Sequence, residues 1–193
     1  MFKSLIIVDM QNDFCTGALK SKDAEAIIPK INEFTKRFRS EEHSYVIFTR
    51  DSHMPNYLQT QEGKLLPTEH CIVNSHGWQI VDGIEQGPYD SLINKPTFGF
   101  KDWQAVFAQL YNIDKNLDEK NAVRPNDYFG TEAEIHIAGT RTDVCVATNA
   151  LLIKTVLPEA KVIVHKSLCS GTDKASNDAA LAVLKSCQCE IED

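Results

Sequence analysis

Three side chains able to carry out nucleophilic chemistry follow apolar runs of the sequence: Asp9, Lys95 and Cys145. Cys145 is the most informative, because the residues around it lead from an apolar run into a helical pattern and place it in the first helical turn. The helix dipole and free N–H groups at that place lower a thiol pKa and can bind an oxyanion. The sequence therefore predicts a thiolate nucleophile, with Thr142 or Asp143 as the N-cap. Taken alone, a cysteine is more often a small buried apolar residue.

Asp9 and Lys95 are candidate partners. Asp9 ends an apolar strand, where a carboxylate is costly unless it is paired, and a nearby ammonium group is its natural partner. Pro96 disfavours the α conformation at Lys95 and so helps to hold that residue extended. Singly, an aspartate at a strand end more often forms a turn or cap, and a lysine is more often solvated. The pairing is a hypothesis at this stage.

A second cluster contains metal-ligand residue types: Asp51, His53, Glu62 and His70. Residues two apart in an extended segment point the same way, so Asp51 and His53 can face one centre. Carboxylate and imidazole ligands together suit zinc, manganese or iron(II) rather than calcium. The alternative is a surface loop that holds no metal. The other histidines and the C-x-C pair are interpreted as structural: His43, His76, His136, His165, Cys187 and Cys189.

The elements that must position these groups alternate along the chain, because apolar runs are separated by segments with helical periodicity. Strands are predicted at Leu5–Val8, Tyr45–Phe48, Ser91–Asn94, Ile135–Ala138 and Val162–Val164. Helices are predicted from about Asp23 to Phe38, and at Trp103–Tyr111, Val144–Leu157 and Asp173–Cys187. The pattern predicts an α/β fold. Parallel strands in such folds bind ligands at their carboxyl ends, which is where all three candidate catalytic residues fall.

The segment from Ser52 to Gln86 has no sustained period and is predicted to be a long loop with short pieces of structure. Loops of this length in compact proteins usually have a function. No glycine-rich phosphate fingerprint is present in the sequence, so we expect no nucleotide cofactor.

Composition excludes several classes of protein. The 193 residues suit one domain, spanning 1–193, and the formal charge of −7 argues against a nucleic-acid partner. The longest apolar run is far below the roughly 20 residues that cross a bilayer, so no membrane partner is expected. Six scattered cysteines are too few for a disulfide scaffold, which favours reduced thiols and a cytoplasmic location.

Together the motifs resemble the isochorismatase-like cysteine hydrolase superfamily, and within it most closely the nicotinamidases. The resemblance rests on segments that match in order over nearly the whole chain: Asp9–Phe14, Asp51–His53, Glu62–Pro67, His70–Cys71, Lys95–Phe98 and Gly139–Val146. It implies a three-layer α/β/α sandwich around a mainly parallel, Rossmann-like sheet. It also implies an Asp9–Lys95–Cys145 triad, a cis peptide bond before Arg141, and an oxyanion hole made by the backbone N–H groups of Arg141 and Cys145.

The same resemblance extends to a metal centre and a substrate pocket. Asp51, His53 and His70 match metal ligands of nicotinamidases, and Glu62 is expected to replace a histidine that this sequence lacks. Phe14 and Phe100 match aromatic pocket positions of the family. Several nicotinamidases have an aromatic residue that stacks on the substrate ring shortly before the position of His70. This sequence has Leu65 and Leu66 there, and Leu66 is expected to line the pocket. By resemblance the chain is also expected to form a homo-oligomer.

The resulting interpretation is a cysteine amidohydrolase that converts nicotinamide to nicotinate and ammonia through a thioester, with a divalent metal as cofactor. A related amidase acting on an N-carbamoyl compound or another small amide is the first alternative. The second is a thiol redox protein in which Cys145 cycles with Cys169 or Cys71, although the sequence contains no C-x-x-C motif. The third is a binding protein without catalytic activity.

Overall fold

Six parallel strands form one sheet in the computed structural model, which describes residues 1–193. Their order is β3-β2-β1-β4-β5-β6, and every neighbouring pair is parallel. The strands are β1 (Phe2–Val8), β2 (Ser44–Asp51), β3 (Ser91–Lys95), β4 (Ala133–Thr140), β5 (Lys161–Ser170) and β6 (Glu190–Glu192). The three-residue edge strand β6 was not predicted, because it is too short to show a period.

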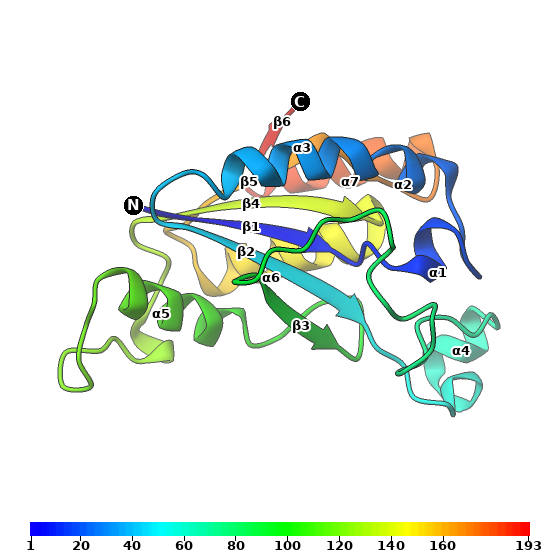
Figure 1. Cartoon of the computed structure of the whole chain (residues 1–193), viewed down its shortest axis with the longest axis horizontal. Helices are drawn as coiled ribbons and strands as arrows, with labels where there is room; N and C mark the ends of the chain where they lie inside the picture. Colours follow the sequence, from blue (N-terminus) through cyan, green and yellow to red (C-terminus); the bar gives the residue numbers. More distant parts are fainter.

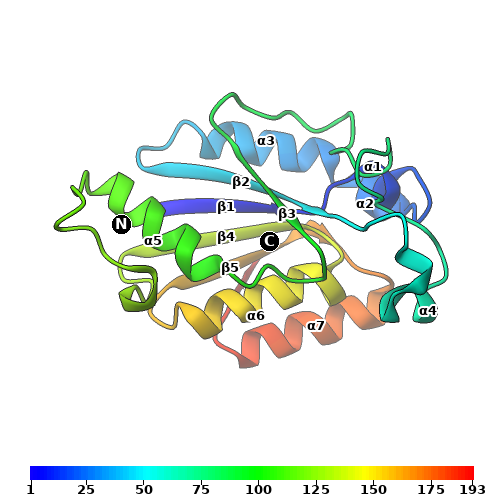
Figure 2. The same ribbon diagram turned by 90° about the horizontal axis from the view of Figure 1, so that it is seen from below.

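Helices cover both faces of this sheet, as Figures 1 and 2 show. On one face lie α2 (Lys22–Ala26) and α3 (Ile28–Phe38), and on the other lie α5 (Trp103–Asp114), α6 (Ala147–Val156) and α7 (Lys174–Ser186). The central strand β1 contributes Leu5 and Ile7 to the first core and Ile6 and Val8 to the second. Burial on both faces explains its continuous apolar sequence. The predicted three-layer α/β/α fold is confirmed.

The helix predicted from about Asp23 to Phe38 is two helices. Ser21 caps α2 by accepting a hydrogen bond from the N–H of Ala24, and α2 ends at Ala26. Pro29 then occupies the first turn of α3, where a missing N–H costs nothing, whereas inside a continuous helix its ring would clash with the preceding turn. The proline therefore fixes the break, which the apolar spacing alone did not reveal.

The carboxyl ends of the strands point to one edge, where the short helices also gather (Figure 1). These are α1 (Asn12–Cys15), η1 (Tyr57–Gln59), α4 (Gln61–Leu65) and η3 (Thr142–Val146); η2 (Pro125–Asp127) follows α5. The segment from Ser52 to Gln86 is thus a long loop with short helical pieces, as predicted. None of the helices is long and apolar enough to span a bilayer.

A pair of histidines, the buried His165 and the half-buried His136, links β4 and β5 beneath α3. Nδ1 of His136 lies 2.8 Å from Nε2 of His165, and Nε2 of His136 lies 3.0 Å from a carboxylate oxygen of Glu134. The ring of His165 packs on Phe34 of α3, with a centroid distance of 4.5 Å. Burial, with a smaller contribution from His136, lowers the pKa of His165 to about 4. His165 is therefore neutral in the folded protein at pH 7.

Because His165 is buried in its neutral form, we expect the protein to lose stability in mild acid. Unfolding releases His165 to an ordinary pKa of about 6.5, so between about pH 6.5 and pH 4 the unfolded state binds the extra proton. The free energy of unfolding should fall by up to about 3 kcal/mol across that window through this residue. Urea unfolding at pH 7 and pH 4.5 measures this fall in the free energy of unfolding. His165→Gln should make the fall smaller, and the control His76→Gln, at an exposed histidine, should leave it unchanged. Equal slopes in all three proteins would contradict the prediction.

Candidate active site

Asp9 and Lys95 form a buried ion pair at the carboxyl edge of the sheet. Asp9 directly follows β1 and Lys95 ends β3, and both residues have no exposed surface. Nζ of Lys95 lies 2.6 Å from Oδ2 of Asp9. Thr49 of the intervening strand β2 donates a hydrogen bond of 2.7 Å from its hydroxyl to Oδ1 of Asp9. The structure thus brings the two hypothesised partners together and adds Thr49, which the sequence analysis missed because its position in β2 resembles that of any buried strand residue.

Cys145 lies beside this pair. Its Sγ is 3.7 Å from Nζ of Lys95, and only 4% of the residue is exposed. The prediction of Thr142 or Asp143 as N-cap is wrong, because Arg141 occupies that position and no side chain caps the turn. The chain enters the helix through the π turn η3, and the carboxylate of Asp143 instead accepts a 2.7 Å hydrogen bond from the N–H of Thr172.

Burial raises the pKa of the Cys145 thiol well above its usual value, and the negative charge of Asp9 raises it further, while Lys95 opposes both. This direction is opposite to the one expected from the helix start, because the thiol is removed from water and lies beside the charge of Asp9. Burial likewise raises the pKa of the Asp9 carboxyl, against the effect of Lys95. A thiol with a raised pKa needs a base before it can act as a nucleophile.

The backbone before Cys145 makes a sharp turn. The peptide bond between Thr140 and Arg141 is cis. The carbonyl of Arg141 accepts hydrogen bonds from the N–H groups on both sides of Cys145, at Val144 and Val146, with lengths of 3.1 and 3.0 Å. Gly139 has φ +121°, and a Cβ there would lie 2.1 Å from the carbonyl oxygen of Val8. Only glycine fits at that position, which explains the residue that opens the motif.

Asp51, His53, Glu62 and His70 converge as the sequence analysis expected, with one ligand atom from each within 4.8 Å of all the others. Nε2 of His53 lies 3.0 Å from Oδ2 of Asp51 and 3.5 Å from Oε1 of Glu62, and Nε2 of His70 lies 3.8 and 4.0 Å from the same two oxygens. Ligand atoms around a tetrahedral zinc ion lie roughly 3.3 Å apart, by the bond lengths of such sites. The four residues therefore fit a divalent metal.

Hydrogen bonds hold these groups in place. Nδ1 of His70 lies 2.8 Å from the carbonyl oxygen of Thr68, and burial lowers the pKa of this ring, so the neutral imidazole donates through Nδ1 and offers the lone pair of Nε2. The second oxygen of Asp51 faces Nζ of Lys95 at 3.6 Å, so the metal cluster and the Asp9–Lys95 pair are contiguous. The side chain of Gln11 bonds both the N–H and the carbonyl of Asp51, a role with no signal in the sequence.

A cavity of about 180 Å³ opens onto Cys145 and the metal cluster. It is lined by Phe14, Leu19, Asp51, Glu62, Leu66, His70, Phe98, Arg141, Val144 and Cys145. Phe14 and Leu66 line it as the resemblance implied, whereas Leu19, Phe98 and Val144 were not predicted. Phe98 lies in the loop that follows β3, three residues after Lys95, and this closeness in sequence to Lys95 is the signal that could have predicted it.

The prediction of Phe100 as a pocket residue is wrong. Its ring packs on Trp103 in the core, with a centroid distance of 5.3 Å, and does not line the cavity. The reason lies at Gly99, where a Cβ would be 2.4 Å from Cδ1 of Leu152 on α6. The loop lies so close to α6 there that it presents Phe98 to the cavity and Phe100 to the core.

Comparison with known families identifies the family of this chain. The sequence model of the Isochorismatase domain family matches residues 3–193. The chain belongs to the isochorismatase family. As a member of that family it is a hydrolase.

Relatives of this isochorismatase-family chain include the nicotinamidase of Saccharomyces cerevisiae, which is 27% identical over 179 residues, covering 77% of this chain and 80% of the yeast protein. The pyrazinamidase of Pyrococcus horikoshii, solved in complex with zinc, superposes with a TM-score of 0.77 at 23% identity, over 99% of this chain and 98% of that one. PnC1 of L. infantum, solved in complex with nicotinate, gives a TM-score of 0.76 at 22% identity, over 98% and 91%. These structures share the fold.

Glu62 is the least expected member of the metal cluster, and its role can be measured. Glu62→Gln should lower the affinity of this isochorismatase-family protein for Zn²⁺ by at least about 10-fold, because it replaces a charged oxygen ligand with a weak neutral one. Competition with a chromophoric zinc chelator measures the affinity. Glu69→Gln removes the same charge from an exposed neighbour of His70 and serves as the control. Equal Zn²⁺ affinities in the wild type and Glu62→Gln would show that Glu62 is not a metal ligand.

Proposed function

We propose that this protein is a cysteine amidase that hydrolyses nicotinamide to nicotinate and ammonia. The proposal rests on one arrangement: the floor of the cavity contains a cysteine whose Sγ lies 3.7 Å from a buried lysine, which in turn lies 2.6 Å from a buried aspartate. A nucleophile, a base and a cation that stabilises their charged forms are the groups that acyl transfer requires.

In the proposed mechanism Asp9 accepts the thiol proton of Cys145, and the sulfur attacks the carboxamide carbon. The backbone N–H groups of Arg141 and Cys145 are proposed to bind the oxygen of the tetrahedral intermediate. Asp9 then gives its proton to the nitrogen, ammonia leaves, and a thioester remains on Cys145. Asp9 next takes a proton from a water molecule whose oxygen attacks the thioester. The C–S bond then breaks, and Asp9 returns the proton to the sulfur, which releases the carboxylic acid and restores the thiol. Lys95 stabilises the negative charge as it moves between Asp9 and the sulfur.

The walls of the cavity support a small aromatic substrate. Phe14, Leu19, Leu66, Phe98 and Val144 make most of the lining apolar, and about 180 Å³ accommodates a single six-membered ring with one carboxamide. A divalent metal held by Asp51, His53, Glu62 and His70 would supply a Lewis acid for a heteroatom of that ring. Zinc in the Pyrococcus pyrazinamidase and nicotinate in PnC1 of L. infantum support both features.

Ammonia release tests the proposal. Purified protein loaded with Zn²⁺, and separately with Mn²⁺ or Fe²⁺, is given nicotinamide, pyrazinamide, benzamide, acetamide and an N-carbamoyl amino acid. Fastest turnover of nicotinamide is the expected result. If only the N-carbamoyl compound is hydrolysed, the proposed substrate is wrong and the proposed triad stands. If the metal-loaded protein hydrolyses none of the compounds, the proposal is overturned.

A further inference from the structure

Asn149 connects the nucleophile to the pocket wall. It lies one helical turn after Cys145, on α6, and has no exposed surface. Its Nδ2 donates to the carbonyls of Cys145 at 2.8 Å and Phe98 at 3.0 Å. Its Oδ1 accepts hydrogen bonds of 2.9 Å from the backbone N–H of Phe100 and from Nε1 of Trp103. All four hydrogen bonds that a side-chain amide can make are therefore used at one position.

These bonds join two segments that supply opposite parts of the site. The loop after Lys95 carries Phe98 into the cavity wall, and α6 continues from the turn that carries Cys145. The close approach of Gly99 to Leu152 and Thr148 presses the same loop onto α6. Nζ of Lys95 also donates to the carbonyl of Thr97 at 3.1 Å. Asn149 is thus the side chain whose hydrogen bonds set the spacing between the Phe98 backbone and the Cys145 backbone.

We propose that Asn149 is a positioning residue that fixes the Phe98 ring relative to Sγ of Cys145 and thereby sets the preference of the site for amides attached to a planar aromatic ring. This inference rests on the proposed amidase function. Its physical basis is that a ring held against Phe98 places its carboxamide at a defined distance from the sulfur. A displacement of about 1 Å in such a contact can reduce turnover about 100-fold.

Asn149→Thr separates this role from simple support of α6. A threonine hydroxyl in a helix can bond the carbonyl four residues earlier, which here is that of Cys145, but it is too short to bridge to the loop. With nicotinamide, kcat/KM should fall by about 100-fold, mainly through kcat, because the carboxamide is displaced from the sulfur, whereas with acetamide, which has no ring, it should fall by less than about 3-fold. An equal loss with both amides would overturn the proposal.

Two further variants make the test specific. Phe98→Ala should cause the same selective loss, and adding Asn149→Thr to it should cause little more, because both changes act through one contact. Gly99→Ala is the substitute variant if Asn149→Thr does not fold. It places a methyl group against Leu152 and Thr148 and should move the loop while Asn149 and Cys145 stay unchanged. It should then cause the same selective loss. Additive losses in the double variant would contradict the proposed route through Phe98.

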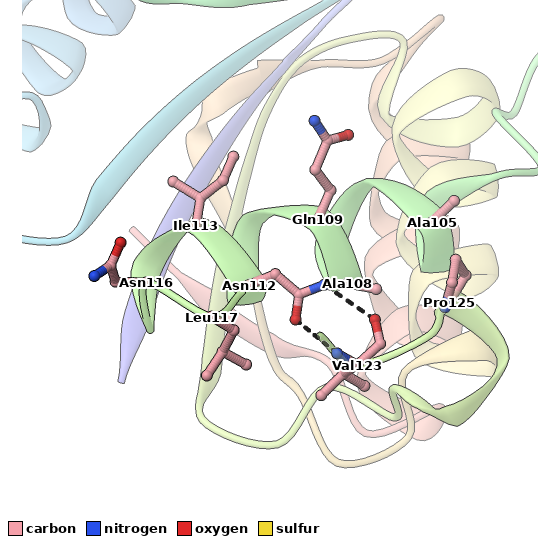
Figure 3. A pocket seen from close by; sticks show the side chains of 9 residues that line it. All are labelled: Ala105, Ala108, Gln109, Asn112, Ile113, Asn116, Leu117, Val123 and Pro125. Carbon is pink, nitrogen blue, oxygen red and sulfur yellow. Dashed lines mark hydrogen bonds between the residues drawn. The ribbon is translucent and has the colours of Figure 1, made fainter. Parts of the chain in front are cut away.

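Asn112→Thr is the matched control. Asn112 also joins a helix to a loop through its amide, bonding the N–H and carbonyl of Val123 at 2.9 and 3.0 Å, as the dashed lines in Figure 3 show. It lines a cleft on α5 and not the cavity at Cys145. This variant should lower the melting temperature and leave the ratio of nicotinamide to acetamide hydrolysis unchanged. A change of that ratio in Asn112→Thr would show that loss of stability alone alters selectivity, which would overturn the proposal.

A second readout does not depend on amidase activity. Alkylation of Cys145 by 2-iodo-N-phenylacetamide and by iodoacetamide, followed by mass spectrometry, gives the rate advantage conferred by a ring. The rate with 2-iodo-N-phenylacetamide divided by the rate with iodoacetamide should fall at least about 10-fold in Asn149→Thr, because the phenyl ring is no longer held at the right distance from the sulfur. An unchanged ratio would overturn the inference, and a selective fall in a protein that hydrolyses no amide would reject the proposed function alone.

Discussion

Cys145→Ala is expected to reduce nicotinamide hydrolysis by at least about 10⁴-fold, to the residual rate that binding alone can provide. Alanine removes the atom that would form the thioester, and no other thiol replaces it. The substitution removes one small, nearly buried side chain and leaves the ion pair of Asp9 and Lys95 in place. Binding of nicotinate, measured by calorimetry, should therefore change little while ammonia release disappears.

The exposed Cys187 provides the control for this experiment. Cys187→Ala should retain wild-type turnover, because that thiol lies at the end of α7, away from the cavity. Wild-type ammonia release by Cys145→Ala would mean that the sulfur is not the nucleophile and would reject the proposed mechanism. Loss of both turnover and nicotinate binding would instead indicate that the cysteine supports the pocket.

Lys95→Met is expected to have the largest effect on stability, lowering the free energy of unfolding by about 3–5 kcal/mol. Methionine fills a similar volume but leaves the carboxylate of Asp9 buried without its cation, since Thr49 supplies a hydrogen bond and no charge. Pairing Lys95→Met with Asp9→Asn removes the uncompensated charge. The double variant should therefore be more stable than Lys95→Met alone, as measured by urea unfolding at pH 7.

The same pair links stability to chemistry. Asp9→Asn and the double variant should both lack turnover, because an amide cannot take the thiol proton, even where the double variant is well folded. We therefore expect the double variant to regain stability without regaining activity, because the Asp9–Lys95 pair serves the reaction rather than the stability of the fold. A double variant no more stable than Lys95→Met would mean that the cost lies in packing rather than in unpaired charge.

Much of the fold follows from local patterns in the sequence. The apolar run Leu5–Val8 indicated a strand buried on both faces, and β1 contributes alternate residues to two cores. The carboxyl ends of the strands suggested where chemistry lies, and Asp9, Lys95 and Cys145 meet there. The four metal-cluster residues also converge. Their chemical types were informative, because charged residues are rarely buried without partners.

Other properties depend on contacts between distant segments. Whether Phe98 or Phe100 lines the cavity was decided by the packing of Gly99 on α6, more than 40 residues later in the chain. The raised pKa of Cys145 follows from its burial beside Asp9, whereas its place at a helix start had suggested the opposite. The sequence by itself determined the elements and the chemically reactive residues, because periodicity and residue type are local properties. Only the tertiary structure decided which side chains touch and how far each lies from water, because both depend on where the loops bring distant residues together.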